Sequence, residues 1–399
     1  MSDQTGMPFG ALQDLRVIEL GQLIAGPFCG QLLADHGAEV IKVEQPVTGD
    51  PMRAWGRTEP LWWPVVGRNK KSITLNLRVP DGQEIVKQLV READILVENF
   101  RPGTMEKWSL GYDELKAINP RLIMVRVSGY GQTGPYASRA GYGGIGEAMG
   151  GLRNLAGDPA TPPSRIGISI GDSLAATMAC LGALMAVHAR ERTGEGQVVD
   201  SAIYEAVLTM MESLIPEYTE TGYVRERTGA ILPKVAPSNV YPTADGEVLI
   251  GANQDTVFRR LCAAMGRPEM ADDPKYADHF ARGDRQQELD DLIGEWSRGL
   301  TTQETLDLME EHAVPAGRIY KVQDMLEDPH YIARDTIVEV DHPLYKKLFM
   351  QNVFPRLSET PGDIQWPGPE LGQHNKEVYE DMLGITPSRL EELKAAGVI

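Results

Sequence analysis

The stretch RVIELGQLIAGPFCGQLLADHGAEVIKV, residues 16–43, decides the fold class. Residues 16–20 form a short apolar run that predicts a strand, and residues 39–43 predict a second one. Between them, residues 27–36 have the composition of a helix, and Gly26-Pro27 predicts a turn before it. Strand, helix and strand in this order form a βαβ unit, which implies a parallel sheet with right-handed crossovers.

The alternation continues beyond this unit. Further strands are predicted at 72–77, 94–97, 122–128 and 197–200, and helices at 81–92, 112–118 and 202–214. The strand at 122–128 is almost continuously apolar, as expected for a strand covered on both faces. Residues 129–151 are rich in glycine and are expected to be a long loop, a kind of segment that often carries function. The sequence therefore predicts an open α/β domain around a parallel sheet.

A second, smaller α/β domain is expected in the C-terminal half. Residues 223–238 are rich in turn formers and predict a linker after a large domain at 1–222. The small domain is expected at 239–325, and residues 326–399 are expected to return to the large domain. The expected elements of this half are a strand at 248–251, helices at 255–265, 285–298, 303–312 and 322–327, strands at 337–340 and 348–354, and two short terminal helices.

Composition excludes several classes of protein. The 399 residues carry a net charge of −18, which argues against nucleic-acid binding because phosphate neutralisation needs a basic surface. The three cysteines form no CxxC pair, so neither a metal site nor a disulfide framework is expected. No signal peptide is visible, and the apolar run 173–189 is shorter than the ~20 residues that span a membrane. We expect a cytoplasmic protein without membrane contact, in which this run is a buried core helix.

Two motifs have to be weighed against simpler explanations. Residues 129–134 read GYGQTG, a formal GxGxxG, but Pro135 and the glycines that follow leave no room for the helix of a dinucleotide site. Asp172 follows Gly171 at the start of the apolar helix. It is interpreted either as an N-cap residue or as a carboxylate nucleophile that the helix dipole keeps ionised. Composition does not decide between these two roles.

A set of ordered motifs resembles one enzyme family. The motifs are Ala25-Gly26-Pro27, residues 37–44 (GAEVIKVE), 69–72 (NKKS), 98–103 (ENFRPG), 129–135 (GYGQTGP), 140–142 (AGY), Gly171-Asp172 and 193–197 (TGEGQ). In this order and spacing the chain resembles the class III CoA-transferases of the CaiB/BaiF type, which include formyl-CoA transferase and carnitine CoA-transferase. The resemblance implies an interlocked homodimer with a Rossmann-like large domain and an inserted smaller domain. It also implies a CoA thioester as substrate, with no permanently bound cofactor and no metal.

The resemblance assigns roles to individual residues. Asp172 matches the catalytic aspartate, which attacks an acyl-CoA thioester and passes through anhydride and aspartyl-CoA intermediates. Tyr142 and Arg227 are expected to contact the substrate. The expected CoA contacts are Ile24, Ala25, Leu75, Asn76, Arg78, Asn99, Phe100, Arg101, Lys107, Arg139 and Ala140. The cations that could hold the CoA phosphates are Arg68, Lys70, Lys71, Arg78, Arg101, Lys107 and Arg139, each of which could instead be a solvated surface charge.

The chain departs from the formyl-CoA enzyme at several positions. Ile24 and Gln45 replace a glutamine and an arginine, and Gly143 stands where many relatives have an acid. The formyl-CoA enzyme has a flexible loop of four glycines that covers its active site, and this loop has no counterpart here between residues 228 and 241. We therefore expect a dicarboxylate acceptor and a succinyl-CoA-like donor. Within the segment 223–239, which faces the active site in relatives, the cations Arg225, Arg227 and Lys234 could hold the second carboxylate.

Two other functions are alternatives to CoA transfer. The same fold houses α-methylacyl-CoA racemases, which need a His/Asp pair, but Tyr142 and Gly143 occupy the places of their AGHD-type motif. A non-catalytic CoA-binding protein would have no need of an acid nucleophile in a glycine-rich setting. The residues therefore favour a CoA-transferase.

Overall fold

A six-stranded parallel sheet forms the centre of the large part of the molecule. The computed structural model describes residues 10–399. The strands are β1 (Arg16–Glu19), β2 (Glu39–Glu44), β3 (Lys70–Thr74), β4 (Ile95–Glu98), β5 (Ile123–Ser128) and β6 (Val198–Ala202). Their order in the sheet is β3-β2-β1-β4-β5-β6, and every neighbouring pair is parallel. The expected parallel α/β sheet is thus confirmed.

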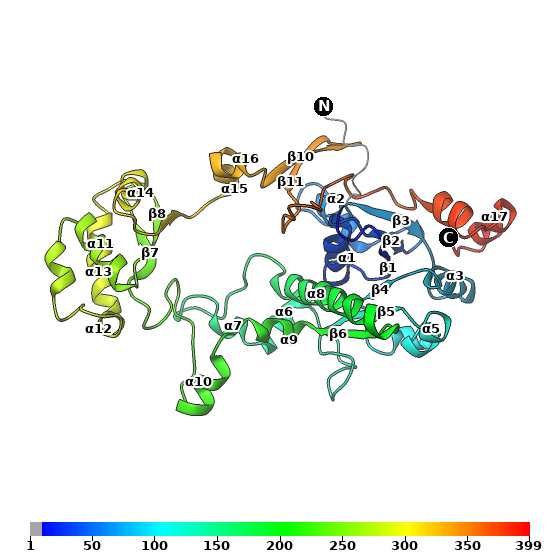
Figure 1. The fold of residues 1–399 in the computed structure, drawn as a ribbon, viewed down its shortest axis with the longest axis horizontal. Coiled ribbons are helices and arrows are strands. Elements are labelled where there is room, and N and C mark those ends of the chain that lie inside the picture. Colours follow the sequence, from blue (N-terminus) through cyan, green and yellow to red (C-terminus); the bar gives the residue numbers. More distant parts are fainter. Residues whose placement is uncertain (1–9) are drawn as a thin grey trace. The chain divides into compact units, whose positions relative to one another are not determined.

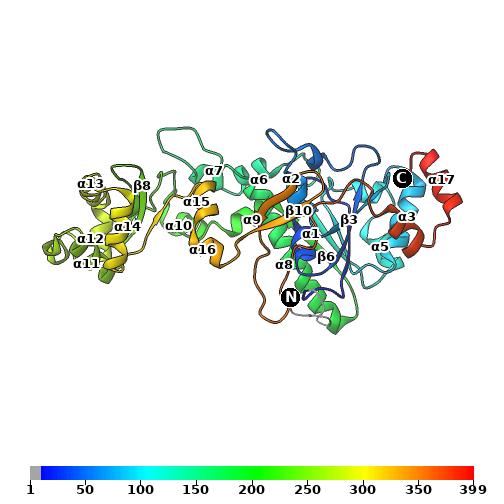
Figure 2. The ribbon, with the colours of Figure 1, turned by 90° about the horizontal axis from the view of Figure 1, so that it is seen from above.

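Helices cover both faces of this sheet (Figures 1 and 2). The large part contains α1 (Ala25–Asp35), α2 (Trp62–Val66), α3 (Pro80–Val90), α4 (Thr104–Lys107), α5 (Tyr112–Ile118), α6 (Gly143–Met149), α8 (Ile170–Thr193), α9 (Ile203–Thr209) and α17 (Pro387–Ala395). Alternate strand residues point to opposite faces. Val17 packs in a core with α1 and α8, whereas Ile18 packs in a second core with α3, α5 and α17. Burial on both faces explains why the strands lack polar alternation.

Several helices differ from the expectations. The first helix begins at Ala25, so Gly26 and Pro27 lie in its first turn instead of in a preceding turn; proline is tolerated there because its missing N–H would have no partner. The glycine-rich stretch contains α6, a helix where only loop was expected, although residues 129–142 are irregular. The expected helix at 202–214 is α9 followed by a break, and α10 (Leu214–Thr221) begins only after it.

The long helix α8 is only partly buried. Its buried face consists mainly of small residues, among them Ala175, Ala179 and Ala183, which allow close packing against α1, β5 and β6. On its other face Leu181 and Met185 are exposed. By length and composition α8 alone among the described helices could cross a membrane, but a core helix passes the same test. The expectation of a fully buried core helix is therefore wrong for one face.

The described chain divides into two compact units. The large unit comprises residues up to 152, 166–215 and 334–399, and the smaller unit comprises 153–165 and 216–333. Residues 153–165 and 216–222, expected in the large domain, thus pack with the smaller unit, as do 326–333. Residues 222–237 contain no helix or strand.

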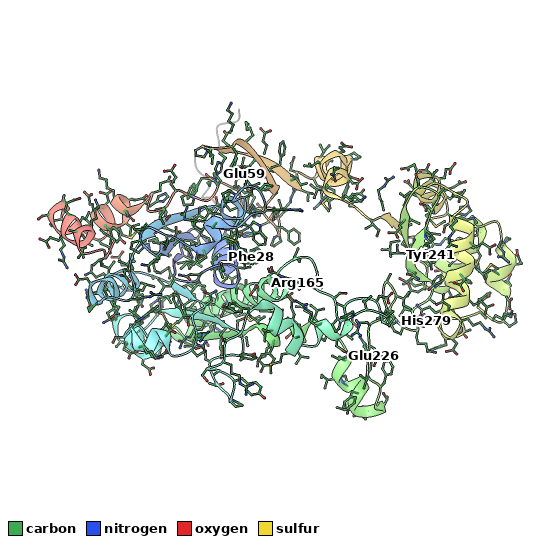
Figure 3. The ribbon with its side chains drawn as sticks, turned by 180° about the vertical axis from the view of Figure 1, so that it is seen from behind. Phe28, Glu59, Arg165, Glu226, Tyr241 and His279 are labelled. Carbon is green, nitrogen blue, oxygen red and sulfur yellow. The ribbon has the colours of Figure 1, made fainter. Side chains whose placement is uncertain are left out.

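The smaller unit has its own sheet and core. Strands β7 (Ser238–Pro242), β8 (Glu247–Gly251) and β9 (Ala316–Arg318) form an antiparallel sheet. The helices that accompany it are α7 (Leu152–Leu155), α10, α11 (Asp255–Ala264), α12 (His279–Asp284), α13 (Gln286–Ser297), α14 (Thr302–Glu311), α15 (Val322–Glu327) and α16 (Pro329–Ala333). Tyr241 lies in this core (Figure 3), where its hydroxyl donates to Asp290 Oδ1 at 2.6 Å.

The C-terminal tail completes the large unit. An antiparallel hairpin of β10 (Ile337–His342) and β11 (Lys346–Gln351) is followed by an irregular crossing, a π-helix at Glu377–Met382 and α17. Tyr379 in the π-helix is fully buried and donates its hydroxyl to the Thr74 carbonyl at 2.5 Å. The Asn375 side chain also bonds Thr74, so the tail is fastened to the end of edge strand β3.

Candidate functional site

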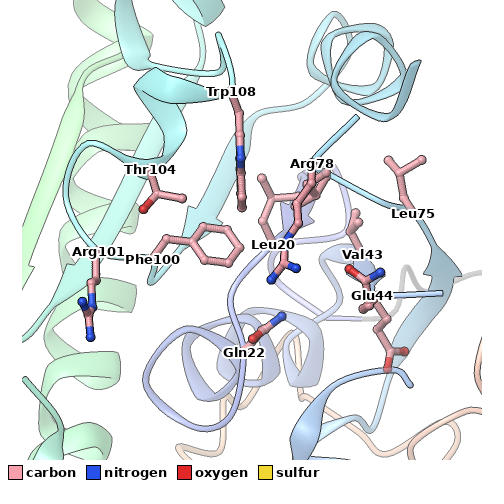
Figure 4. Close-up of a pocket in the computed structure, with 12 residues that line it drawn as sticks. Leu20, Gln22, Val43, Glu44, Leu75, Arg78, Phe100, Arg101, Thr104 and Trp108 are labelled. Atoms are coloured by element: carbon pink, nitrogen blue, oxygen red, sulfur yellow. The ribbon is translucent and has the colours of Figure 1, made fainter. Parts of the chain in front are cut away.

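A pocket lies at the carboxyl ends of the central strands. In the order β3-β2-β1-β4-β5-β6 the strands β1 and β4 are neighbours, and the crossovers leave them in opposite directions. Such a switch point is where open α/β sheets bind ligands. The pocket there measures about 280 Å³ (Figure 4). Its lining residues are Leu20, Gln22, Val43, Glu44, Gln45, Leu75, Leu77, Arg78, Phe100, Arg101, Thr104 and Trp108.

Two arginines give the pocket a positive character. Arg78 reaches into it from beyond β3, and Arg101 lies at its rim on the side of Phe100 (Figure 4). Within residues 10–399 neither guanidinium makes a hydrogen bond or an ion pair. The acid in the lining, Glu44, is instead fully engaged by Arg53 at 2.6 and 2.8 Å and by the Ser72 hydroxyl at 2.6 Å. The free groups of the pocket are therefore suited to phosphate.

Three other candidate cations are committed to ion pairs. Arg68 is buried and donates to Asp35 at 2.6 Å. Lys70 is fully buried and pairs with Glu19 at 2.8 Å. Lys71 pairs with Glu39 and Glu377. The suggestion that these three could supply charge to CoA phosphates is therefore wrong for this structure, because each already neutralises an acid.

The expected CoA contacts fall into four groups. Leu75, Arg78, Phe100 and Arg101 line the pocket itself. Ile24, Ala25 and Asn99 lie beneath or beside the loop that follows β1: Ile24 packs on Met52 and Trp63, Ala25 lies in the sheet core, and Asn99 bonds the Gln22 backbone. The residues near the pocket that do not line it are Asn76, whose Oδ1 accepts the Arg78 N–H at 3.1 Å, and Lys107, exposed at the end of α4.

The fourth group lies in the loop between β5 and α6. Arg139 and Ala140 are exposed and do not line the pocket. The Arg139 guanidinium stacks on the Tyr136 ring with 3.7 Å to its centroid. Tyr142 is 72% exposed and precedes the first residue of α6. This loop therefore presents a cation and an aromatic ring to solvent.

Asp172 lies in the first turn of α8. The N-cap is Ser169, so Asp172 is the third helical residue and the N-cap interpretation is wrong. Its half-buried carboxylate lies against Gly143, where an added Cβ would stand 2.3 Å from Oδ2. A Cβ on Gly171 would similarly stand 2.9 Å from the Gly143 carbonyl oxygen. The starts of α6 and α8 thus meet through two glycines beside this carboxylate.

The smaller unit carries the other candidate substrate residue. Arg225 forms a two-pronged pair with Glu217 at 2.7 Å, and Lys234 pairs with Asp284 at 2.5 Å. Arg227 makes a single long bond from Nη1 to the Asn154 carbonyl at 3.4 Å, and its buried Nε has no partner among the described residues. Of the three cations of this segment, Arg227 has the most unused donors.

A buried acid supports the β4 end of the pocket. Glu98 accepts the Phe100 N–H at 2.7 Å and pairs with Arg126 at 2.7 Å. Burial raises the pKa of Glu98 to about 7, although the neighbouring Arg126 opposes this rise. The same arginine binds Glu106, and that hydrogen bond lowers the pKa of the Glu106 carboxyl.

The sequence did not predict several of the residues that line the pocket. They are Leu20, Gln22, Val43, Glu44, Gln45, Thr104 and Trp108. Most lie at or just after the last residue of a strand that the sequence does predict, so position alone could have indicated them. Trp108 is different, because it reaches the pocket through an edge-to-face contact with Phe100, with ring centroids 5.1 Å apart.

The fold and pocket define a doubly wound α/β protein with two unpaired arginines in a pocket at its switch point. The description "CoA-transferase family III" matches residues 12–375, and the chain belongs to this family. It is therefore a CoA-transferase, as its resemblance predicts. The racemase and the non-catalytic binder are set aside.

Individual relatives agree with this assignment. The chain is 62% identical over 393 residues to the succinyl-CoA–D-citramalate CoA-transferase of Chloroflexus aurantiacus, covering 97% of this chain and 98% of the relative. It is 36% identical over 385 residues to the succinyl-CoA:mesaconate CoA-transferase of Haloarcula marismortui, covering 93% and 96%. A crystal structure of a CaiB/BaiF family protein from Brucella suis matches with a TM-score of 0.83 at 32% identity, covering 94% of this chain and 99% of that one.

Proposed function

We propose that the protein transfers CoA from succinyl-CoA to a small dicarboxylic acid of the citramalate type, with Asp172 as the covalent carrier. The names of the two relatives support this donor and this class of acceptor. The observation that carries the role of Asp172 is its place at the third position of α8 against Gly143. A carboxylate in the first turn of a helix is favoured in its ionised, nucleophilic form.

The reaction proceeds through four substitutions at acyl carbon. An Asp172 oxygen attacks the thioester carbonyl of succinyl-CoA, the C–S bond breaks, and the CoA thiolate leaves from the mixed anhydride. The thiolate attacks the Asp172 acyl carbon and releases succinate, which leaves an aspartyl-CoA thioester. The acceptor carboxylate then displaces the thiolate, which attacks the acceptor's acyl carbon in turn. This last step frees the Asp172 carboxylate and yields the new CoA thioester.

The pocket at the sheet switch point holds part of CoA in this proposal. Arg78 and Arg101 have unused guanidinium donors for phosphate oxygens, and Phe100 and Trp108 supply apolar walls. Arg227 is the proposed anchor for the second carboxylate of the acceptor, since its donors are the least occupied in its segment.

A homodimer is also part of the proposal, interlocked as the family resemblance implies. Ile145, Met149, Leu181 and Met185 on α6 and α8 are each 45–60% exposed, which supports a second copy as their cover. Mixing tagged and untagged dimers for hours tests the interlocking, because linked chains should form no mixed dimers.

A cytoplasmic location is also proposed. Cys29, Cys180 and Cys262 are free thiols, consistent with a reducing cytoplasm.

Trapping the covalent intermediate tests the nucleophile. The enzyme is incubated with succinyl-CoA in the absence of an acceptor, digested, and analysed by mass spectrometry. We expect one succinate released per active site and the mass of CoA on the peptide that contains Asp172. Asp172→Ala should abolish both, whereas Asp113→Ala, which removes a first-turn acid from α5, should change neither. An adduct that persists in Asp172→Ala would refute the assignment.

A further inference from the structure

The loop after β1 is held by side chains from distant parts of the chain. The Gln22 N–H donates to Asn99 Oδ1 at 2.8 Å, and Asn99 Nδ2 donates to the Gln22 carbonyl at 2.8 Å. A single side-chain amide that follows β4 therefore binds both backbone polar groups of Gln22. The same Gln22 lines the pocket, so Asn99 controls the position of a pocket wall.

A buried ion cluster holds the residues on either side of Gln22. Asp50 accepts the Leu23 N–H at 3.1 Å and the Met52 N–H at 2.9 Å. The Lys42 ammonium pairs with Asp50 at 2.8 Å and with Glu19 at 3.3 Å, and it also donates to the Gly21 carbonyl. The side chains of these three ionised residues are fully buried. A charged cluster without contact to water keeps its geometry only while all its members are paired.

The loop needs this support because its backbone is strained. Leu23 has φ +64°, in the left-handed region that residues with a Cβ rarely adopt. Gly21 has little room for a side chain, since a Cβ there would stand 3.1 Å from both Asn99 Oδ1 and the Gly26 Cα. Such a conformation persists only when its surroundings impose it.

We propose that Asn99 and Asp50 are positioning residues that fix the loop Gly21–Ile24 before CoA binds. The proposal rests on the proposed binding of CoA by this pocket. By resemblance Asn99 was expected to contact CoA directly, but both its Oδ1 and one N–H of its Nδ2 group bond the Gln22 backbone. Its contribution to CoA binding passes through the Gln22 backbone, and that of Asp50 passes through the Leu23 N–H. Preorganising a loop in this way strengthens binding because ordering costs are met before the ligand arrives.

Hydrogen exchange of the ligand-free protein tests the positioning without any reference to activity. With amide resolution, Asn99→Ala should speed exchange of the Gln22 amide at least tenfold, and Asp50→Asn should do the same for the Leu23 amide. Asn119→Ala is the matched control: Asn119 also donates to two backbone carbonyls of the large unit, those of Val90 and Ala93, away from the pocket. This control should leave the exchange rates of the Gln22 and Leu23 amides unchanged.

Titration with free coenzyme A then measures the consequence for the pocket. We expect Asn99→Ala and Asp50→Asn to raise the Kd of coenzyme A about tenfold, and Asn119→Ala to leave it within twofold. A raised Kd with unchanged loop exchange in Asn99→Ala would overturn the proposal in favour of direct contact. Unchanged exchange and unchanged Kd in both loop variants would overturn it outright. If the wild type binds no coenzyme A, the proposed function fails, and the exchange data alone still decide whether the two side chains fix the loop.

Discussion

Replacing Gly143 by alanine adds one methyl group beside the proposed nucleophile. That carbon would stand 2.3 Å from Asp172 Oδ2, 2.8 Å from Cγ and 3.0 Å from Oδ1, whereas ordinary contacts begin at 3.4 Å. The nearest oxygen must therefore move by about 1 Å. Gly143 does not have a positive φ, so alanine fits its backbone. The change displaces a carboxylate without straining the main chain.

The size of the effect follows from this displacement. A misplacement of ~1 Å at a reacting group can cost about 10²-fold in rate, which corresponds to about 2.7 kcal/mol of activation free energy. We expect kcat to fall about a hundredfold in Gly143→Ala. Unfolding free energy should change by less than about 1 kcal/mol, because the atoms that must move are at the end of a side chain. The Kd of coenzyme A should stay unchanged, because Gly143 does not line the pocket.

The assay measures the initial rate of CoA transfer from succinyl-CoA to D-citramalate, together with the rate at which the CoA adduct forms without acceptor. Gly294→Ala in α13 is the control, since its added carbon would lie 3.8 Å from the nearest atom, Pro242 Cδ. A folded Gly143→Ala enzyme with kcat within threefold of wild type would show that the carboxylate tolerates this neighbour. The inferred steric role of the glycine would then be wrong.

Four further outcomes are expected. Asp172→Ala should lower turnover by several orders of magnitude, because it removes the proposed covalent carrier, while a urea melt shows a folded protein. Arg101→Ala should raise the Kd of coenzyme A roughly tenfold in titration calorimetry, with a smaller effect at high salt, because it removes the proposed charge-assisted bond to phosphate. Arg227→Ala should raise the acceptor KM for D-citramalate tenfold or more, about 1.4 kcal/mol, and leave that for a monocarboxylate unaffected. Burial raises the pKa of Glu98 from 4.5 to about 7, so between these pH values the folded state binds more protons than the unfolded state. The free energy of unfolding should therefore fall as pH rises through this range, by about 1 kcal/mol per pH unit. In urea melts across this range, Glu98→Gln should remove this pH dependence.

Much of the fold could be predicted because each strand is a short apolar run between turn formers. The runs at 16–20 and 122–128 became β1 and β5 within a residue or two. The helix α6 could not be predicted, because its sequence GGIGEAM has three glycines, and glycine disfavours helices. Tertiary contact overrides this preference: Cβ atoms at Gly146 would clash with Ile203, so the glycines are what let α6 pack.

The candidate site was less predictable, because ion pairing is decided by the packed structure. Lys70 and Arg78 are close in sequence and equally plausible as phosphate ligands. Lys70 points inward from β3 and meets Glu19 of β1, two strands away in the sheet, so its charge is consumed. Arg78 lies past the end of β3 and meets no acid. The register of strands far apart in sequence makes this difference.

Pairing also explains how a chain with a net charge of −18 can bind a polyanion. Charges that are more than about 10 Å away are largely screened at 0.1 M salt, so the field in the pocket depends on the groups that line or adjoin it. There the acids have partners, Glu44 with Arg53 and Glu98 with Arg126, while Arg78 and Arg101 have none among the described residues. The local balance is positive although the total is negative. Net charge therefore excludes an extended nucleic-acid surface but places no limit on a phosphate site built from a few unpaired arginines.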